Sequence, residues 1–342
     1  MKTADTQALP APPNLIAALI AGFDTLTTQL GLVCFPLALD LFLWLGPRLS
    51  LSGLFRRFSA GLEQLLQAEL SGPLAGQTPG AAELLEYNRQ IWAALGERLN
   101  LFVGLRTYPV GIPSLMAARQ PLHSPAAAPL TLEPASGVQA LLLWLGLSLA
   151  GLAVAALYFQ LVSQAALTGK ASPLQALRRW PRSTVQVAAL TLIWVALAAA
   201  ISIPGSCLLS VFTLGGLGTS SIGVFVFALM LLWIFFPLFL SPHGIFVNGR
   251  GAWSSLRDSL RLTYRLYPQT SLFFLAVFVL SEGLEVLWRL PAEESWLALV
   301  GIAGHGFITT GLLAASFIYY READRWVQRV VQQLKFSDTH RS

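Results

Sequence analysis

The sequence predicts an all-α integral membrane protein, with six transmembrane helices as three hairpins, interfacial amphipathic helices and a helical extracytoplasmic insertion. Two observations support this fold class. Of the 342 residues, 55% are hydrophobic and only 11% are charged, whereas about a quarter of the residues in a soluble domain are charged. The hydrophobic residues also gather in stretches of the roughly 17 to 25 residues that a bilayer core requires. A surface so poor in charge suits lipid rather than water.

The N-terminal region is predicted to contain a tail, an interfacial helix and the first span. Residues 1–13 are polar and proline-rich, so we expect a disordered cytoplasmic tail. Residues 14–46 hold an interfacial helix, whose apolar pattern is interrupted at Asp24, and then a span over Leu30–Gly46. The prolines that precede the apolar stretch argue against a cleavable signal peptide.

Residues 47–137 form the predicted helical extracytoplasmic insertion. Leucines and phenylalanines recur at helical spacing over Leu51–Leu70, and a second amphipathic pattern covers Leu84–Phe102. Five prolines lie between Tyr108 and Leu132, so we expect this stretch to be irregular. Two helices of this size cannot build a large core of their own. We therefore expect them to pack on each other and on the outer face of the membrane.

The remaining spans lie within residues 138–320, which we expect to form one helical bundle. Each predicted span has about the length that a bilayer core requires. These spans are Val138–Gln164, Thr184–Pro204, Ile222–Ser241, Thr270–Trp288 and Trp296–Tyr320. Gly301, Gly304, Gly306 and Gly311 in the last span indicate close packing against neighbouring helices. Residues 321–342 are expected to form a cytoplasmic tail.

Lys and Arg are concentrated in alternate loops, and this pattern predicts the orientation. The 165–183 and 242–269 loops each hold four Lys or Arg residues and at most one acid, whereas the 205–221 loop has no charge. By the positive-inside rule, both termini lie in the cytoplasm and the insertion lies outside. We expect a multi-pass protein of the plasma membrane.

Three segments share one order: a Pro or Gly turn, an amphipathic helix and a span that runs outward. They begin near Pro13, Pro173 and Gly251. Parallel repeats of this kind are known in membrane proteins. The alternative is that any inner loop followed by a span has this appearance, and the sequence leaves both interpretations open.

The junction before the fifth span resembles a group of polytopic proteins that includes the membrane domain of some bacterial glycerophosphodiester phosphodiesterases. The resemblance covers the last three spans. It is carried by Gly249-Arg250-Gly251-Ala252-Trp253 and by Leu256-Arg257-Asp258-Ser259-Leu260-Arg261-Leu262-Thr263. This chain has no phosphodiesterase catalytic domain, so the resemblance implies a membrane scaffold fold without that activity.

Several ionisable side chains fall within spans or at their ends, where charge is costly and often functional. On helices in lipid they can form a polar cluster in the outer half of the membrane. The candidate residues are Asp40, Glu282, Glu285, Arg289 and His305. One interpretation is a cation or proton site, or an anchor for a polar headgroup. The other is that Glu285 and Arg289 neutralise each other while Asp40 acts as a cap or pairs with Arg48.

The amphipathic helix predicted over Ala252–Tyr267 carries arginines at every fourth position. Lying in the inner leaflet, each arginine can gain about 1 kcal/mol from anionic lipid. The candidate contacts with anionic inner-leaflet headgroups are Arg250, Arg257, Arg261, Arg265 and His243. The same surface is also a candidate docking site for a cytoplasmic partner such as an ATPase.

No set of side chains suggests catalysis, so we expect no enzyme, cofactor or metal site. The net charge of +5 is not accompanied by a nucleic-acid-binding motif. Cys34 and Cys207 are expected near opposite membrane faces, too far apart for a disulfide. The expected function is non-enzymatic membrane organisation or lipid handling. The alternative is a transport function, as a permease subunit that works with a cytoplasmic ATPase or an ion gradient.

Overall fold

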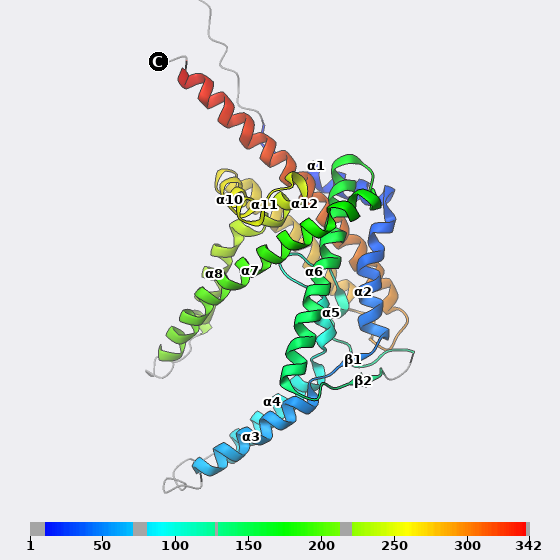
Figure 1. Cartoon of the computed structure of the whole chain (residues 1–342), viewed down its shortest axis with the longest axis vertical. Helices are drawn as coiled ribbons and strands as arrows, with labels where there is room; N and C mark the ends of the chain where they lie inside the picture. Colours follow the sequence, from blue (N-terminus) through cyan, green and yellow to red (C-terminus); the bar gives the residue numbers. More distant parts are fainter. Residues whose placement is uncertain (1–10, 71–80, 127–128, 213–220, 340–342) are drawn as a thin grey trace, which may run out of the picture.

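The computed structural model describes residues 11–70, 81–126, 129–212 and 221–339 (Figure 1). This part of the chain is almost entirely helical, and its two strands, β1 (Arg48–Leu49) and β2 (Thr131–Leu132), form one short parallel pair. Five of its helices are long and apolar enough to cross a membrane, and a bent pair makes a sixth candidate. The predicted all-α membrane fold is confirmed. Most of the predicted tail, residues 1–10, lies outside the described residues.

The candidate spans agree with the predicted ones but extend beyond them. They are α6 (Gly137–Thr168), α7 (Pro173–Phe212), the run of α8 (Ser221–Phe235), η4 (Phe236–Leu238) and α9 (Ser241–Asn248), then α11 (Tyr267–Trp288) and α12 (Ala298–Thr339). We expected α7 to end near Pro204, but the helix continues through this proline. Residues 321–339, which we expected to form a cytoplasmic tail, continue the α12 helix.

The N-terminal pair consists of α1 (Leu15–Thr28), η1 (Leu30–Val33) and α2 (Cys34–Leu45), with a bend of 93° between α1 and the rest. The break at Gln29 lies where the sequence separates the interfacial helix from the first span. The α1 helix packs on α12 through Ala18, Gly22 and Leu26. A Cβ atom at Gly22 would lie 2.5 Å from the backbone nitrogen of Ala315, so only glycine permits this contact.

The α12 helix is the centre of the bundle. Its Tyr319 ring stacks on Phe273 of α11 with 4.2 Å between ring centres, and its Thr310 accepts a 2.9 Å hydrogen bond from Tyr158 of α6. The predicted close packing of its glycines is confirmed, because a Cβ atom at Gly304 would lie 2.7 Å from the Trp288 ring. The remaining spans are thus arranged around this helix.

The α-helical hydrogen bonding is interrupted at η4, between α8 and α9. Side chains of α10 (Ala252–Arg265) bond to carbonyl oxygens at this interruption. The buried face of α10 carries hydroxyl groups at every fourth position. Ser255 donates to the carbonyl oxygen of Ser241, and Ser259 donates to that of Pro237 at 2.7 Å. Backbone carbonyls freed at a break within lipid need such partners. This need explains why α10 packs against η4 and α9.

The three predicted repeat units differ in the structure. In the third, the separate amphipathic helix α10 precedes the span. In the second, the amphipathic part and the span form the single 40-residue helix α7. In the first, α1 packs along α12 and bends sharply into α2.

The insertion contains α3 (Ser52–Leu70), α4 (Ala81–Arg98), η2 (Leu101–Leu105) and α5 (Leu115–Arg119). Helices α3 and α4 form a hairpin that projects from the bundle (Figure 1), with the rings of Phe55 and Trp92 stacked 5.4 Å apart. We expected residues 108–132 to be irregular. Residues 108–114 are irregular, whereas 115–119 form α5, and Val110, Leu115 and Met116 are fully buried in the main core.

The bundle has two ends that differ in composition. The turns at Gly169 and Gly249, helix α10 and the C-terminal half of α12 make up what we call the arginine end. The insertion and the two strands make up the insertion end. Figure 1 shows α10 and the C-terminus of α12 near one end, and the α3–α4 hairpin at the other.

Candidate functional site

Two cavities open at the arginine end, and Arg250 lines both of them. The α10–α12 cavity has a volume of about 390 Å³, and its polar lining includes Arg250, Asp258, Arg261, Arg265, Asp324 and Gln328. The α7–α9 cavity has a volume of about 480 Å³, and its polar lining includes Gln160, Arg179, Arg182, Ser183, Gln186 and Arg250. Five arginines therefore surround two adjacent cavities.

The turn between α9 and α10 positions Arg250. Gly249 ends α9 with a left-handed backbone, φ +63°, which favours glycine. The backbone N–H of Ala252 then donates a 2.8 Å hydrogen bond to Oε1 of Gln186 on α7. Because both ends of this short turn are held, Arg250 lies between the two cavities.

The arginines of α10 lie on the face opposite its buried hydroxyl groups. Arg257, Arg261 and Arg265 are all exposed. The structure brings Arg261 and Arg265 to the α10–α12 cavity together with Arg250, as the sequence suggested. Arg257 lines neither cavity and lies apart from this group.

The two cavities differ in their charge. In the α10–α12 cavity, Asp258 forms an ion pair with Arg250, and Asp324 accepts hydrogen bonds from Asn248 and Gln328. Partial burial opposes the charge of Arg250, but the hydrogen bond and the attraction of Asp258 outweigh it and raise the pKa of this guanidinium. The α7–α9 cavity has three arginines and no acidic residue in its lining. It is thus the more positive of the two.

The lining of the α7–α9 cavity suits a phosphate group. Arginine presents a planar set of donors that matches phosphate oxygens. The Gln160 side chain is only 2% exposed and accepts a 3.2 Å hydrogen bond from Ser183, so its NH₂ group remains as a further donor. Arg182 donates weakly, at 3.5 Å, to the carbonyl oxygen of Gly249. The cavity therefore combines fixed positive charge with a buried amide.

His243 does not lie with the arginines. It is 5% exposed, its Nε2 atom is 2.8 Å from the Ser316 hydroxyl, and its ring contacts those of Phe317 and Tyr320. We expected His243 at headgroup level, near a lipid phosphate. The structure instead places it inside the contact between α9 and α12.

Asp40 connects the first span to the start of α5 in the insertion. Its carboxylate accepts hydrogen bonds from the Ser114 hydroxyl and from the backbone N–H groups of Leu115, at 3.1 Å, and Met116, at 2.9 Å. It therefore caps the start of α5. Arg48, the other suggested partner of Asp40, donates to the carbonyl oxygens of Glu97 and Arg98. Hydrogen-bond donors of the insertion therefore satisfy the buried carboxylate of Asp40.

Of the five intramembrane candidates, an ion pair joins Glu285 to Arg289 among the described residues. This pair lies at the end of α11, and Glu282 is exposed on the same helix. His305 is 4% exposed in α12. Among the described residues, no hydrogen bond or ion pair joins Asp40 to Glu282, Glu285 or Arg289.

Sequence reasoning missed the residues that complete the α7–α9 cavity. Arg179 and Arg182 entered the argument only as charges that set the orientation, and Gln160 was read as part of an apolar span. The signal was the spacing of the two arginines, three residues apart near the start of α7, which places them on one helical face. Their convergence with Arg250 required the packing of α7 on α9.

In comparisons with protein-family models, curated proteins and solved structures, nothing matches this chain. The resemblance to the membrane domain of glycerophosphodiester phosphodiesterases thus stays a prediction. The functional argument depends on the geometry of the two cavities.

Proposed function

We propose that this chain is a non-enzymatic protein of the plasma membrane that binds anionic phospholipids at its arginine end. In this proposal the arginine end and both termini face the cytoplasm, and the role is lipid handling or membrane organisation. The observation that carries the proposal is the α7–α9 cavity, whose lining contains three arginines and no acid.

The energetics favour a lipid ligand for this cavity. Each arginine near an anionic surface contributes about 1 kcal/mol, and arginine–phosphate contacts are stronger than exposed ion pairs because they use several hydrogen bonds. The arginine end terminates helices long enough to span a membrane, so its cavities lie near the level where lipid headgroups are found. The Lys and Arg residues of the short loops gather at this end, which also supports a cytoplasmic location for it.

Native mass spectrometry tests the proposal by titrating the purified chain with phosphatidylglycerol and, separately, phosphatidylcholine. We expect preferential binding of phosphatidylglycerol. The double substitution Arg179→Gln and Arg182→Gln should weaken it roughly 30-fold, because two contacts of about 1 kcal/mol are lost. Arg257→Gln is the matched control, since Arg257 is an exposed arginine that lines neither cavity. Equal affinity for the two lipids, or equal effects of the double variant and the control, would contradict the proposal.

The permease hypothesis predicts a different result in the same spectra. A permease subunit would use the exposed face of α10 to dock an ATPase, so gentle extraction from the native membrane would yield a complex of fixed stoichiometry with a nucleotide-binding subunit. The Arg257→Gln change would then weaken the complex, because Arg257 belongs to the exposed face.

A further inference from the structure

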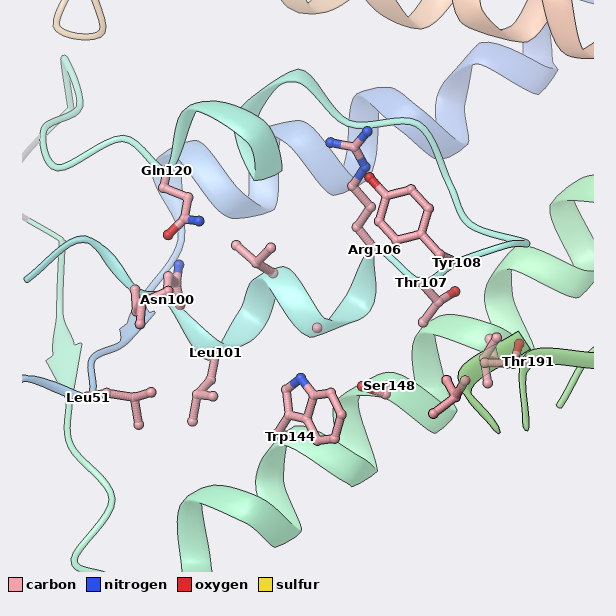
Figure 2. A pocket seen from close by; sticks show the side chains of 15 residues that line it. Leu51, Asn100, Leu101, Arg106, Thr107, Tyr108, Gln120, Trp144, Ser148 and Thr191 are labelled. Atoms are coloured by element: carbon pink, nitrogen blue, oxygen red, sulfur yellow. The ribbon is translucent and has the colours of Figure 1, made fainter. Parts of the chain in front are cut away.

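A third cavity, of about 550 Å³, lies where η2 packs against α6, and residues of α7 complete its lining. Its lining is mainly apolar and includes a few polar side chains. Figure 2 shows Arg106, Tyr108 and Gln120 on one side of η2, and Trp144 and Ser148 of α6 on the opposite side. Leucine and valine side chains complete the apolar part, among them Leu101, Leu152 and Val195. The cavity is therefore amphipathic.

The polar side of this cavity lies at the depth of the hydrophobic helices. A Cβ atom at Gly151 would lie 2.3 Å from the carbonyl oxygen of Leu105, so the residue before Arg106 touches α6 at Gly151. Gly151 is about 21 Å along α6 from the end of that helix at Gly137, at 1.5 Å per residue. A charged side chain at such depth normally faces a partner or a cavity and marks a functional site.

Arg106 is held in place without being neutralised. It donates a 3.1 Å hydrogen bond to the carbonyl oxygen of Ser114, and its guanidinium carbon is 5.4 Å from the centre of the Tyr108 ring. Among the described residues it forms no salt bridge. Asp40 attracts it, but the Asp40 oxygens already accept hydrogen bonds from α5. The charge of Arg106 is thus available to an anionic ligand.

Two polar atoms in the lining are buried and have no hydrogen-bond partner among the residues that the structure describes. They are Oε1 of Gln120 and Oγ1 of Thr191. Buried polar atoms are nearly always hydrogen-bonded, so such atoms indicate a ligand or a water molecule. Gln120 also has a left-handed backbone, φ +47°, which is uncommon for a residue other than glycine.

We propose that this cavity binds an anionic phospholipid with hydroxyl groups in its headgroup, of the phosphatidylglycerol type. The phosphate contacts the Arg106 guanidinium, and a headgroup hydroxyl donates to Oε1 of Gln120. An acyl chain lies along the apolar side, past Trp144 and Leu152. The charge of Arg106 requires an anion, and the apolar half of the lining requires a hydrocarbon chain. The site is separate from the arginine end and does not depend on the function proposed there.

Amide hydrogen exchange of the backbone that lines the cavity, measured in lipid nanodiscs, tests this site. The chain is compared in phosphatidylcholine alone and with enough phosphatidylglycerol to occupy the site by about 90%. At that occupancy, exchange of the amides that become protected on binding slows roughly tenfold. We expect this slowing in residues 100–108, which contain η2 and Arg106.

Two variants remove the site in different ways. Arg106→Gln removes the charge, and Ser148→Phe fills the apolar side without changing any charge, so each should abolish the slowing in residues 100–108. The second variant decides the question if the first does not fold. Arg98→Gln, an exposed arginine outside the lining, should keep the full effect.

The Arg179→Gln and Arg182→Gln variant should also keep this slowing, because those residues belong to the other site. If the slowing were lost in that variant, a single lipid site would explain both effects, and the proposal of a separate site would be contradicted. The proposal is likewise overturned if phosphatidylglycerol does not slow exchange in the unchanged chain, or if the slowing persists in both Arg106→Gln and Ser148→Phe.

Discussion

At the scale of single residues, Asp40 is the side chain whose role changes most once the fold is known. An acid in an apolar helix is a functional candidate by default, yet this carboxylate is completely buried and accepts three hydrogen bonds from the start of α5. Its partners lie more than seventy residues away in the chain. The acid joins the first span to the insertion.

This role predicts a loss of stability when Asp40 is changed. In Asp40→Ala, the Ser114 hydroxyl and two backbone N–H groups lose their buried acceptor, at about 1–3 kcal/mol for each unsatisfied group. The melting temperature in detergent should fall clearly. Glu282→Gln is the control, because Glu282 is exposed on α11. If both variants melted at the temperature of the unchanged chain, Asp40 would not be a structural cap.

At the scale of elements, α10 performs two tasks on opposite faces. Its serine and threonine side chains satisfy carbonyl oxygens at the break between α8 and α9, and its arginines line a cavity. The packing on α9 is close, because a Cβ atom at Gly244 would lie 2.2 Å from the Ser255 hydroxyl oxygen. The position of the arginines thus depends on the buried hydroxyl groups.

Removing those hydroxyl groups should loosen α10 without changing its charge. In the double variant Ser255→Ala and Ser259→Ala, the carbonyl oxygen of Ser241 loses its side-chain partner and that of Pro237 keeps only the 3.5 Å bond from Thr263. We expect a cost of about 1–3 kcal/mol for each lost bond. Hydrogen exchange of the α10 amides should accelerate. Ser254→Ala on the same helix is the control, since within the described part of the chain the Ser254 hydroxyl donates only to the carbonyl oxygen of Gly251 at the helix start. Equal exchange in the two variants would argue against the docking role.

Residues 106–122 show why part of the fold could not be predicted from the sequence. Five prolines between Tyr108 and Leu132 indicated an irregular segment, and the local sequence pattern gives no sign that part of it is buried. The burial of Val110 and Leu115 follows from the long-range contact with Asp40 and from the space between α2, α6 and α12. By contrast, the spans could be predicted directly from the length of the hydrophobic stretches, which is a local property of the sequence.

Only some residues of the candidate site could be predicted from the sequence. Arg250, Arg261 and Arg265 were recognised because their spacing along one amphipathic segment is visible in the chain. Arg179, Arg182 and Gln160 come from α6 and α7, and they meet Arg250 only through helix packing. His243 looked like an interfacial residue from its place beside Pro242, but the approach of α12 buries it.

At the scale of the whole molecule, the long α12 helix joins the two ends. It contacts α11 and α6 through Tyr319 and Thr310, and α1 through Ala315, where Gly22 leaves no room for a Cβ atom. The proposed orientation then assigns the insertion end to the outside and the C-terminal part of α12 to the cytoplasm.

Labelling with a membrane-impermeant maleimide on intact cells tests that orientation. In a background with Cys34 and Cys207 replaced by alanine, Gly61→Cys on α3 should react, because a side chain there meets open space. Arg329→Cys, exposed near the end of α12, should react only after the membrane is permeabilised. The reverse pattern would invert the topology and place the arginine end outside.

The central claim, that anionic lipid occupies the arginine end, is tested most directly by photocrosslinking in vesicles. The probe is an anionic phospholipid with a photoreactive group next to its phosphate, and the labelled residues are mapped by mass spectrometry. The account predicts labels in residues 179–186 and 245–250, which line the α7–α9 cavity, and their loss in the Arg179→Gln and Arg182→Gln variant. Labels confined to exposed helix surfaces such as α8, unchanged in that variant, would contradict it.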